Sequence, residues 1–263
     1  MARVGILGLG AVGTAVCSGM GRYHSTGTYD SDGRGSLTDI LNTAAVFICV
    51  PTNGLEEGSL DLSAVESASS KLYEVDYRGL VIVKSTLHPG SMEVLTKRYR
   101  NLRLVYMPEF LRERDAAAWF LEPDRIVVSG LDSDVDKALA LFKWVPEYVP
   151  RLRMTHGEAE IAKLAHNAYI ATKVTFTCEI ERICELNAVD VSKVMEVVWR
   201  DKRVGNSAHL SPGLGGFGGK CVPKDTRSLR QIDSQPDDQS LLAFILRYGT
   251  DKAVRSRRKV VLE

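Results

Sequence analysis

Apolar residues gather in short runs over the first 150 residues, and mixed segments of helix length separate most of these runs. The runs are rich in Val, Ile and Leu and show little alternation of apolar and polar residues, which is typical of strands buried on both faces of a sheet. They cover residues 3–7, 44–50, 80–85, 102–107 and 125–129, and the more polar residues 27–30 are interpreted as a second strand between the first two runs. We therefore predict a doubly wound α/β fold with a Rossmann-like parallel sheet, completed by a helix at 132–144 and a short last strand at 147–150.

The pattern changes after residue 150. Residues 158–187 form one long helical pattern, with Ile161, Leu164 and Ala168 on one face. Shorter helical patterns follow at 191–200, at 224–232 and from about 239 to the end. We predict two domains, residues 1–150 and 151–263, of which the second is all-helical around a long central helix. An apolar stripe on such a helix usually needs a partner.

The composition is that of an ordinary globular protein, and it limits the classes of function. Of 263 residues, 44% are hydrophobic and 25% are charged, and the net charge of +1 offers no broad field for nucleic acid or an anionic membrane. No stretch reaches the roughly 18 consecutive apolar residues of a membrane span. The five cysteines lack zinc-ligand spacing, so we expect no metal site, and their odd number fits a reducing cytoplasm.

The first apolar run ends at a glycine motif. Gly8, Gly10 and Gly13 stand in the spacing G-x-G-x-x-G, with Val12 among them, and small residues that can form a helix follow. Between a strand and a helix, such glycines permit a tight turn, close approach of a pyrophosphate and packing of the helix on the strand. The motif alone is a weak signal, but with the predicted sheet it indicates a dinucleotide site.

Asp30 ends the second predicted strand, residues 27–30, about 20 residues after the glycine motif, where an acid would bind the ribose diol of a dinucleotide. Its charge would repel a 2′-phosphate, which favours NAD over NADP. Arg34 is a nearby cation that weakens this preference. The alternative is a plain turn aspartate beside Asp32 and Gly33.

Polar residues follow the later strands. Pro51 and Thr52 come after the third, residues 85–90 after the fourth and residues 108–113 after the fifth. Because ligands bind at the carboxyl ends of parallel strands, we expect one functional rim at this edge of the sheet. His88 is interpreted as a loop residue rather than a general base, since the sequence gives it no partner.

A cysteine in a glycine loop marks the second half of the chain. Cys221 follows four glycines within residues 215–219 and stands between Lys220 and Lys224, with Asp225 four residues on. The glycines leave room for a ligand, and the two ammonium groups favour the thiolate, which is the nucleophilic form of cysteine. The alternative is a mobile surface loop with an incidental cysteine.

Two polar residues of the long helical pattern are a second candidate. Lys163 and Asn167 are four residues apart and therefore project from one side of the helix. Taken alone, the pair indicates an exposed face that keeps the helix soluble.

Six motifs stand in a fixed order at residues 8–13, 47–52, 85–90, 108–113, 158–167 and 216–225. Together they resemble the UDP-glucose/GDP-mannose dehydrogenase family of NAD-dependent nucleotide-sugar 6-dehydrogenases. The form Pro108-Glu109-Phe110-Leu111, followed by residues 123–126, resembles the UDP-glucose branch more than the N-acetylmannosamine branch.

The resemblance implies a four-electron oxidation of the C6 hydroxyl of a nucleotide sugar, UDP-glucose to UDP-glucuronate, with NAD as cofactor. Cys221 would form a thiohemiacetal and then a thioester with the substrate. Lys163 and Asn167 would stabilise the oxygen at the reacting carbon. Asp225, with Lys163, would hold the water that acts as base in the first step.

The resemblance also assigns contacts to the water, the cofactor and the substrate. Thr86 and Glu113 would position or activate the water that hydrolyses the thioester. The implied cofactor contacts are Gly8, Gly10, Val12, Gly13, Asp30, Pro51, Thr52, Thr86 and Lys224. The implied substrate contacts are Glu109, Phe110, Leu111, Lys163, Asn167, Phe217 and Gly218.

The sequence departs from the family pattern in two places. Only about 14 residues separate Asp30 from the third strand, where the family carries a longer helical excursion. The chain ends at Glu263, inside what resembles the family's long connecting helix and before its nucleoside-diphosphate-binding domain. Three explanations stay open: a naturally short enzyme completed by a partner subunit or a separate domain, a truncated chain, or a short enzyme that oxidises a smaller alcohol.

We expect a homodimer in the cytoplasm, because the family resemblance makes the partner of the long helix a second copy. Two other functions remain as alternatives. One is a two-electron dehydrogenase of the β-hydroxyacid type, which uses a helix lysine and asparagine without a cysteine. The other is an NAD-binding remnant without turnover.

Overall fold

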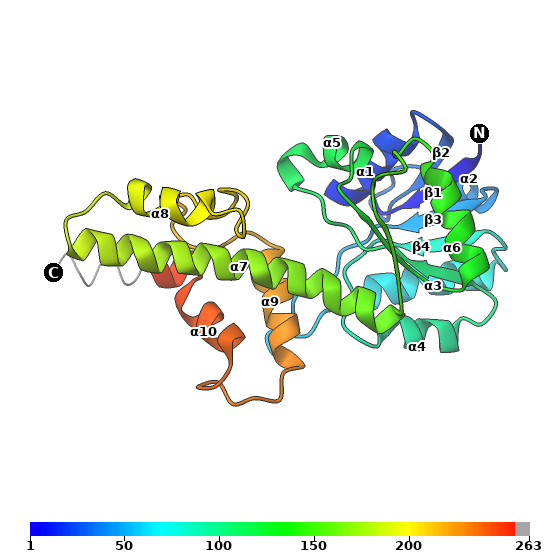
Figure 1. The fold of residues 1–263 in the computed structure, drawn as a ribbon. Helices are drawn as coiled ribbons and strands as arrows, with labels where there is room; N and C mark the ends of the chain where they lie inside the picture. Colours follow the sequence, from blue (N-terminus) through cyan, green and yellow to red (C-terminus); the bar gives the residue numbers. More distant parts are fainter. Residues whose placement is uncertain (256–263) are drawn as a thin grey trace. The chain divides into compact units, whose positions relative to one another are not determined.

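The computed structural model describes residues 1–255 and divides the chain into two compact units (Figure 1). The first unit comprises Met1–Asn53 and Leu60–Lys163, and the second comprises Gly54–Ser59 and the residues from Leu164 onward. A short loop after the third strand therefore belongs to the second unit. The domain limits of 1–150 and 151–263 stay a prediction about independently folding parts.

The first unit is built on a seven-stranded sheet with the order β2-β1-β3-β4-β5-β6-β7. The strands are β1 (Arg3–Leu7), β2 (Ser25–Tyr29), β3 (Ala45–Ile48), β4 (Leu80–Val83), β5 (Arg103–Tyr106), β6 (Ile126–Ser129) and β7 (Arg151–Met154). All neighbouring strands pair in parallel except β5 and β6, which meet antiparallel at Tyr106 and Ser129. The predicted Rossmann-like fold is thus confirmed.

Two details of the predicted sheet are wrong. The prediction made all strands parallel, but a parallel neighbour is normally reached through a crossover helix. The link from β5 to β6 holds only the 3-10 helix η1 (Glu113–Asp115) and the short helix α5 (Ala116–Leu121). The last strand was expected at 147–150 and lies at β7 instead, because Pro150 has no N–H for a ladder and Val149 N–H closes a turn on the Pro146 carbonyl at 3.1 Å.

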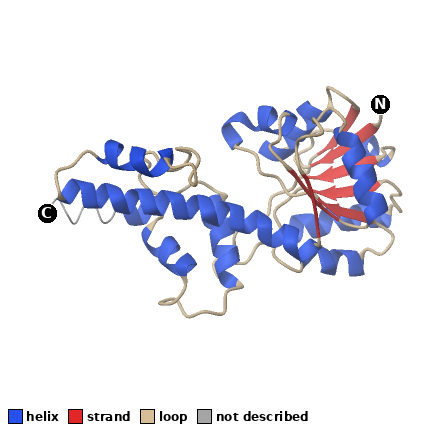
Figure 2. Cartoon of the chain, viewed as in Figure 1, coloured by secondary structure: helices blue, strands red, loops and turns tan. Residues whose placement is uncertain are grey.

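The strands are buried on both faces, which explains their continuous apolar sequence. In β3, Ala45 and Phe47 belong to one hydrophobic cluster, whereas Val46 and Ile48 belong to the other. Residues of α1 (Ala11–Met20), α5 and α6 (Asp132–Leu139) pack into the first cluster. Residues of α2 (Leu37–Leu41), α3 (Ser63–Glu74) and α4 (Ser91–Arg98) pack into the second, so that helices cover the sheet on both sides (Figure 2). The 3-10 helix η2 (Ala140–Phe142) follows α6.

The second unit is helical. It contains most of α7 (His156–Leu186), which begins in the first unit, together with α8 (Val191–Arg200), α9 (Val222–Gln231) and α10 (Leu241–Tyr248). Its core includes Ala171, Val174 and Cys178 of α7 with Phe217 and Ile245. The predicted long central helix is confirmed. Within residues 1–255, no helix combines the length and the apolar composition needed to cross a membrane.

The expected continuous helix from about residue 239 is interrupted. α10 ends at Tyr248, where Gly249 passes so close to α7 that a Cβ atom there would lie 1.7 Å from Thr175 Oγ1. The amide of Phe217 donates to the Gly249 carbonyl at 2.8 Å, and the amide of Asp251 donates to the Phe217 carbonyl at 2.9 Å. This break therefore anchors the start of the glycine loop that leads to Cys221. The part of the predicted helix at 256–263 lies outside the described residues.

Candidate active site

The glycine motif forms a tight turn between β1 and α1. Gly8 has a φ of +94°, and a Cβ at Gly13 would lie 1.8 Å from the Gly8 carbonyl oxygen, so only glycine lets α1 start this close to the strand. Gly10 is the N-cap of α1 without a side-chain cap, and the space in front of it is open. Exposed backbone N–H groups at the start of a helix suit a pyrophosphate.

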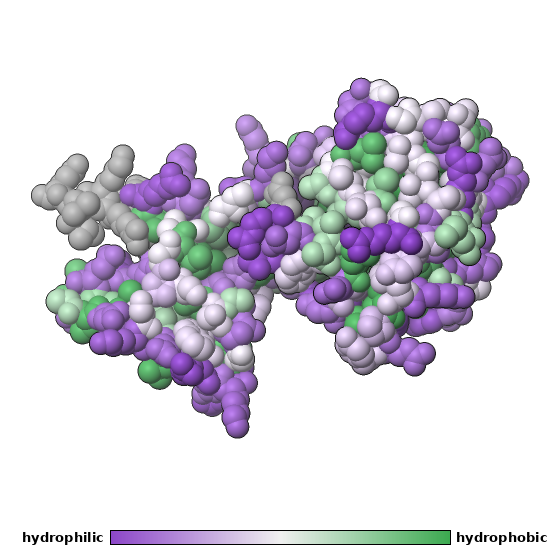
Figure 3. Space-filling view, turned by 90° about the horizontal axis from the view of Figure 1, so that it is seen from above, coloured by the Kyte–Doolittle hydropathy of each residue, from purple (hydrophilic) through white to green (hydrophobic). Residues whose placement is uncertain are grey.

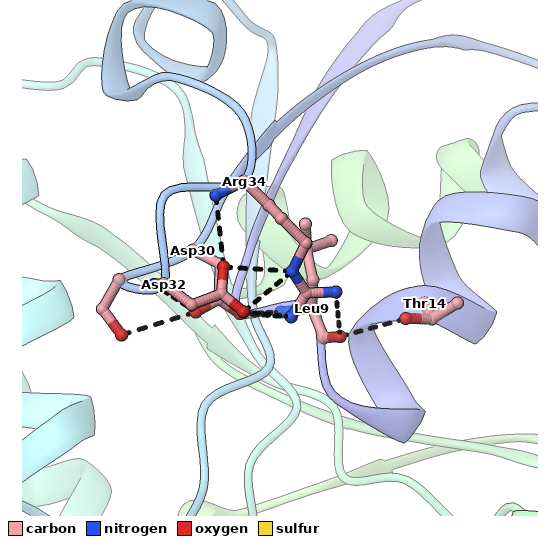
Figure 4. Close-up of polar contacts among 6 residues, drawn as sticks. Leu9, Thr14, Asp30, Asp32 and Arg34 are labelled. Atoms are coloured by element: carbon pink, nitrogen blue, oxygen red, sulfur yellow. Dashed lines mark hydrogen bonds and ion pairs between the residues drawn. The ribbon is translucent and has the colours of Figure 1, made fainter.

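Asp30 lies against this turn, as expected for a ribose-binding acid (Figure 4). It directly follows β2, and its Oδ2 accepts a hydrogen bond from the Leu9 amide at 2.5 Å. Its Oδ1 accepts from the Asp32 amide at 3.2 Å. Asp30 is thus both a turn aspartate and the acid beside the glycine turn, and the two interpretations of the sequence do not exclude each other.

The loops after β3 and β4 meet at the carboxyl edge of the sheet. The Ser85 hydroxyl donates to the Val50 carbonyl at 2.7 Å and ties the two loops together. In the loop after β3, Thr52 is buried and Pro51 is exposed. Thr86, in the loop after β4, is half-buried. His88 lies in the loop before α4, where burial lowers the pKa of its imidazole.

The loop after β5 carries a buried ion pair that the sequence analysis missed. Lys84, at the end of β4, places its Nζ 2.7 Å from Oε2 of Glu109, and the two side chains are only 4% and 15% exposed. A lysine at the end of an otherwise apolar strand is the signal that could have revealed it. Together with Phe110 and Leu111, the pair lines a cavity of about 30 Å³. This cavity has room for about one water molecule.

Phe110 is flanked by two cations. The Arg125 guanidinium lies 4.3 Å from the centre of its ring, and Lys163 Nζ lies 5.3 Å from it. Both distances allow cation–π attraction, so the ring orients Lys163 from α7. Glu113 begins η1, and its side chain lies outside the described part of the structure.

Lys163 and Asn167 do not form an exposed face, because they are only 8% and 7% exposed. The Asn167 amide donates to Oδ2 of Asp225 at 2.6 Å, and its Oδ1 lies 3.2 Å from Nδ1 of His166. Lys224 Nζ lies 2.7 Å from the other oxygen of Asp225, whose carboxylate is 1% exposed. The structure thus joins three of the predicted site residues in one buried polar group.

Cys221 is the N-cap of α9 and is exposed. Its carbonyl accepts from the Asp225 amide at 2.9 Å, so the cysteine and the buried carboxylate stand one helical turn apart on the same helix. The positive end of the helix dipole stabilises negative charge at this position. Phe217, which precedes Cys221 in the loop, is buried in the core of the second unit, and Gly218 lies close to Asp251, so the loop is anchored at its start.

The other cysteines suit a nucleophilic role less well. Cys49, Cys178 and Cys184 are buried and Cys17 is half-buried. Burial raises the pKa of the Cys49 thiol to about 12. No group of three or more potential metal-binding side chains occurs within residues 1–255.

Comparison with known proteins is consistent with this geometry. Residues 34–145 match the NAD binding domain of the UDP-glucose/GDP-mannose dehydrogenase family, and residues 157–244 match its central domain. The first match names the cofactor that the sequence analysis expected, NAD. The glycine turn and Asp30 precede the matched residues, so their assignment rests on the contacts above.

Individual relatives point the same way. The chain is 34% identical to a UDP-glucose 6-dehydrogenase of Haloferax volcanii over 226 residues, which is 79% of this chain and 50% of the relative. A UDP-glucose dehydrogenase structure from Pyrobaculum islandicum is similar with a TM-score of 0.81 and 29% identity, covering 99% of this chain and 68% of that one. A UDP-D-ManNAc dehydrogenase structure from Pyrococcus horikoshii, with a TM-score of 0.85 and 20% identity over 99% of this chain and 70% of that one, shares the fold. The chain spans about half the length of the curated relatives it matches.

Proposed function

Because the chain belongs to the UDP-glucose/GDP-mannose dehydrogenase family, we propose that it is an NAD-dependent dehydrogenase that oxidises the C6 hydroxyl of a nucleotide sugar, with UDP-glucose as substrate and UDP-glucuronate as product. The observation that carries the proposal is the hydrogen-bonded group of Asn167, Lys224 and the buried Asp225, of which Lys224 and Asp225 lie on α9 directly after the exposed Cys221. A reactive thiol one turn from a hydrogen-bonded carboxylate is suited to covalent catalysis.

The cofactor fits the residues of the first unit. The uncapped start of α1 offers N–H groups to a pyrophosphate, and Asp30 offers carboxylate oxygens to ribose hydroxyls. When bound, NAD⁺ would supply the hydride acceptor, one molecule for each of the two oxidations. Pro51, Thr52, Thr86 and Lys224 are proposed as further cofactor contacts.

The residues of the site have distinct tasks in this scheme. Asp225, with Lys163, holds the water that takes the proton from the C6 hydroxyl during the first oxidation. The Cys221 thiolate then adds to the aldehyde carbon and keeps the aldehyde bound as a thiohemiacetal. Lys163 and Asn167 donate to the oxygen on that carbon, where one donor contributes about 3 kcal/mol to transition-state stabilisation.

The second oxidation converts the thiohemiacetal into a thioester of Cys221. Water attacks the thioester carbonyl, the C–S bond breaks, and the carboxylate product and the free thiol result. Thr86 and Glu113 are proposed to position this water. Glu109, Phe110, Leu111, Phe217 and Gly218 are proposed to contact the substrate.

The ratio of NADH formed to UDP-glucose consumed tests the route. Two NADH per uronate are expected for the full chain, and Cys221→Ser should abolish uronate formation. Cys17→Ser, at a half-buried cysteine outside the proposed site, is the matched control and should keep the ratio of two. A ratio of one that Cys221→Ser leaves unchanged would instead support the two-electron β-hydroxyacid type of reaction. NAD binding without turnover would support the remnant.

A second copy is the proposed partner. Tyr169, Phe176 and Ile183 recur every seven residues on α7 and are 63%, 45% and 44% exposed, and hydrophobic surface is visible on the second unit in Figure 3. Such a stripe favours helix pairing. We propose that this stripe pairs with the same stripe of the second copy. Sedimentation of the full chain would measure its oligomeric state.

All five cysteines are free thiols, which supports the proposed cytoplasmic location.

A further inference from the structure

The turn after β2 is closed tightly on its own strand. The Asp30 amide donates to the Arg34 carbonyl at 2.9 Å, and Gly35 forms an isolated antiparallel bridge with Tyr29. Gly35 has a φ of +73°, and a Cβ there would lie 2.0 Å from the Thr28 carbonyl oxygen. The backbone of Arg34 is therefore fixed beside Asp30 by contacts that do not involve its side chain.

The guanidinium of Arg34 connects this turn to the glycine turn (Figure 4). Nε donates to both carboxylate oxygens of Asp32, at 3.0 and 2.8 Å, and Nη2 lies 2.7 Å from Asp32 Oδ2. Nη1 donates to the Leu9 carbonyl at 3.1 Å, and Nη2 lies 3.5 Å from Oδ2 of Asp30. Most N–H groups of the guanidinium are thus engaged, chiefly by Asp32.

The charge count of the turn disfavours a phosphate. Two carboxylates, Asp30 and Asp32, face one guanidinium, and the guanidinium is held by the carboxylate that a dinucleotide does not need. In dinucleotide sites an acid binds the ribose 2′-hydroxyl of NAD, whereas a nearby arginine accommodates the 2′-phosphate of NADP. Both elements are present here within five residues.

We infer that Asp32 determines which dinucleotide the chain accepts, because it withholds Arg34 from a 2′-phosphate. This inference rests on the NAD site of the proposed function. Asp30 alone does not decide the choice, since its Oδ2 is already bound to the Leu9 amide and its charge is partly balanced by Arg34.

Because the Asp32–Arg34 pair is exposed, loss of the Asp32 carboxylate alone should be enough to release Arg34. The side chains of Asp32 and Arg34 are 50% and 54% exposed, and exposed ion pairs are weak. The hydrogen bond from Arg34 is the main cause that lowers the pKa of Asp32, so Asp32 stays charged and keeps its hold on Arg34 at neutral pH. Without that carboxylate, Arg34 is free to form charge-assisted hydrogen bonds with a phosphate.

Calorimetric titration of the full chain with NAD⁺ and with NADP⁺ tests the inference, since the two ligands differ only in the 2′-phosphate. Asp32→Asn keeps the oxygen that accepts from the Arg34 amide at 3.1 Å and removes the charge. We expect this variant to raise the affinity for NADP⁺ relative to NAD⁺ by about fivefold, because releasing Arg34 from an exposed ion pair recovers about 1 kcal/mol. Adding Arg34→Gln should abolish the gain.

Asp201→Asn is the matched control. Asp201 pairs with Arg203 at the same spacing, with Nε–Oδ1 at 3.0 Å and the Arg203 amide at 2.8 Å from Oδ1, in the second unit. The Asp201→Asn variant should show the same ratio of NADP⁺ affinity to NAD⁺ affinity as the unchanged protein. An unchanged ratio in Asp32→Asn, or a gain that persists after Arg34→Gln, overturns the inference and leaves the proposed function intact. Failure of the unchanged protein to bind NAD⁺ contradicts the proposed function itself.

Discussion

The buried pair of Lys84 and Glu109 should be the most sensitive ionic contact of the first unit. Lys84→Met removes the ammonium 2.7 Å from the carboxylate and leaves Glu109, which is only 15% exposed, without its counter-charge. Breaking one partner of a buried pair costs about 3–5 kcal/mol. Because Glu109 keeps some access to water, we expect a loss near the lower limit, about 3 kcal/mol in the free energy of unfolding.

The double variant Lys84→Met/Glu109→Leu separates the charge effect from packing. Replacing a whole buried pair by apolar residues is often neutral or stabilising, so the double variant should lie within about 1 kcal/mol of the unchanged protein. Urea unfolding followed by tryptophan fluorescence measures these values. Replacing Trp199 by Phe restricts the signal to Trp119 and Trp144, which both lie in the first unit.

An exposed pair of the same unit provides the control. Arg78 and Asp76 are 75% and 53% exposed, so Arg78→Met should cost less than about 1 kcal/mol. Two results would refute this reasoning. One is a cost of Lys84→Met no larger than that of Arg78→Met. The other is a loss in the double variant equal to the sum of the losses in Lys84→Met and in Glu109→Leu alone.

Two further buried contacts make predictions. Glu160→Gln retains one acceptor for the amides of Gly90 and Met92, each 2.7 Å from the carboxylate, and should cost about 1–3 kcal/mol. Burial raises the pKa of Glu160 above 4.5, so the contribution of this side chain to the free energy of unfolding is complete below pH 4.5 and decreases as the pH rises. Urea unfolding should therefore show a larger difference between the unchanged protein and Glu160→Gln near pH 4 than at pH 7. Equal differences at the two pH values would contradict this prediction. Asn167→Ala removes the donor 2.6 Å from the buried Asp225 and should cost about 1.5–3 kcal/mol, clearly more than Asn187→Ala, which breaks an exposed bond. Both variants lie in the second unit, so their urea unfolding is followed with Trp199, after Trp119 and Trp144 are replaced by Phe.

Local sequence pattern predicted the parts of the fold that depend on it. The apolar runs of β1, β3 and β4 are buried on both faces, and the glycine motif lies at the turn where the sheet meets α1. The direction of β6 and the interruption after α10 were not predictable in the same way. Strand direction depends on the path of a connection, and the break at Gly249 depends on its distance from Thr175, which is 74 positions earlier in the chain.

The candidate site shows the same division. The spacing of Lys163 and Asn167 placed them on one helix face, but only the contacts with Phe110 and Asp225 show that this face is buried. Lys84 stands visibly at the end of an apolar run, but its partner Glu109 lies 25 positions later in the chain, so the sequence alone did not show the pair. The roles given to Thr86 and Glu113 stay predictions.

The exposure of Cys221, in contrast to the burial of Cys49, Cys178 and Cys184, makes the thiols of this protein chemically unequal. A bulky alkylating reagent applied to the native protein would attach a mass label or a fluorophore mainly at the start of α9. A ligand bound over Cys221 would slow this labelling, so the labelling rate would report occupancy without any measurement of turnover.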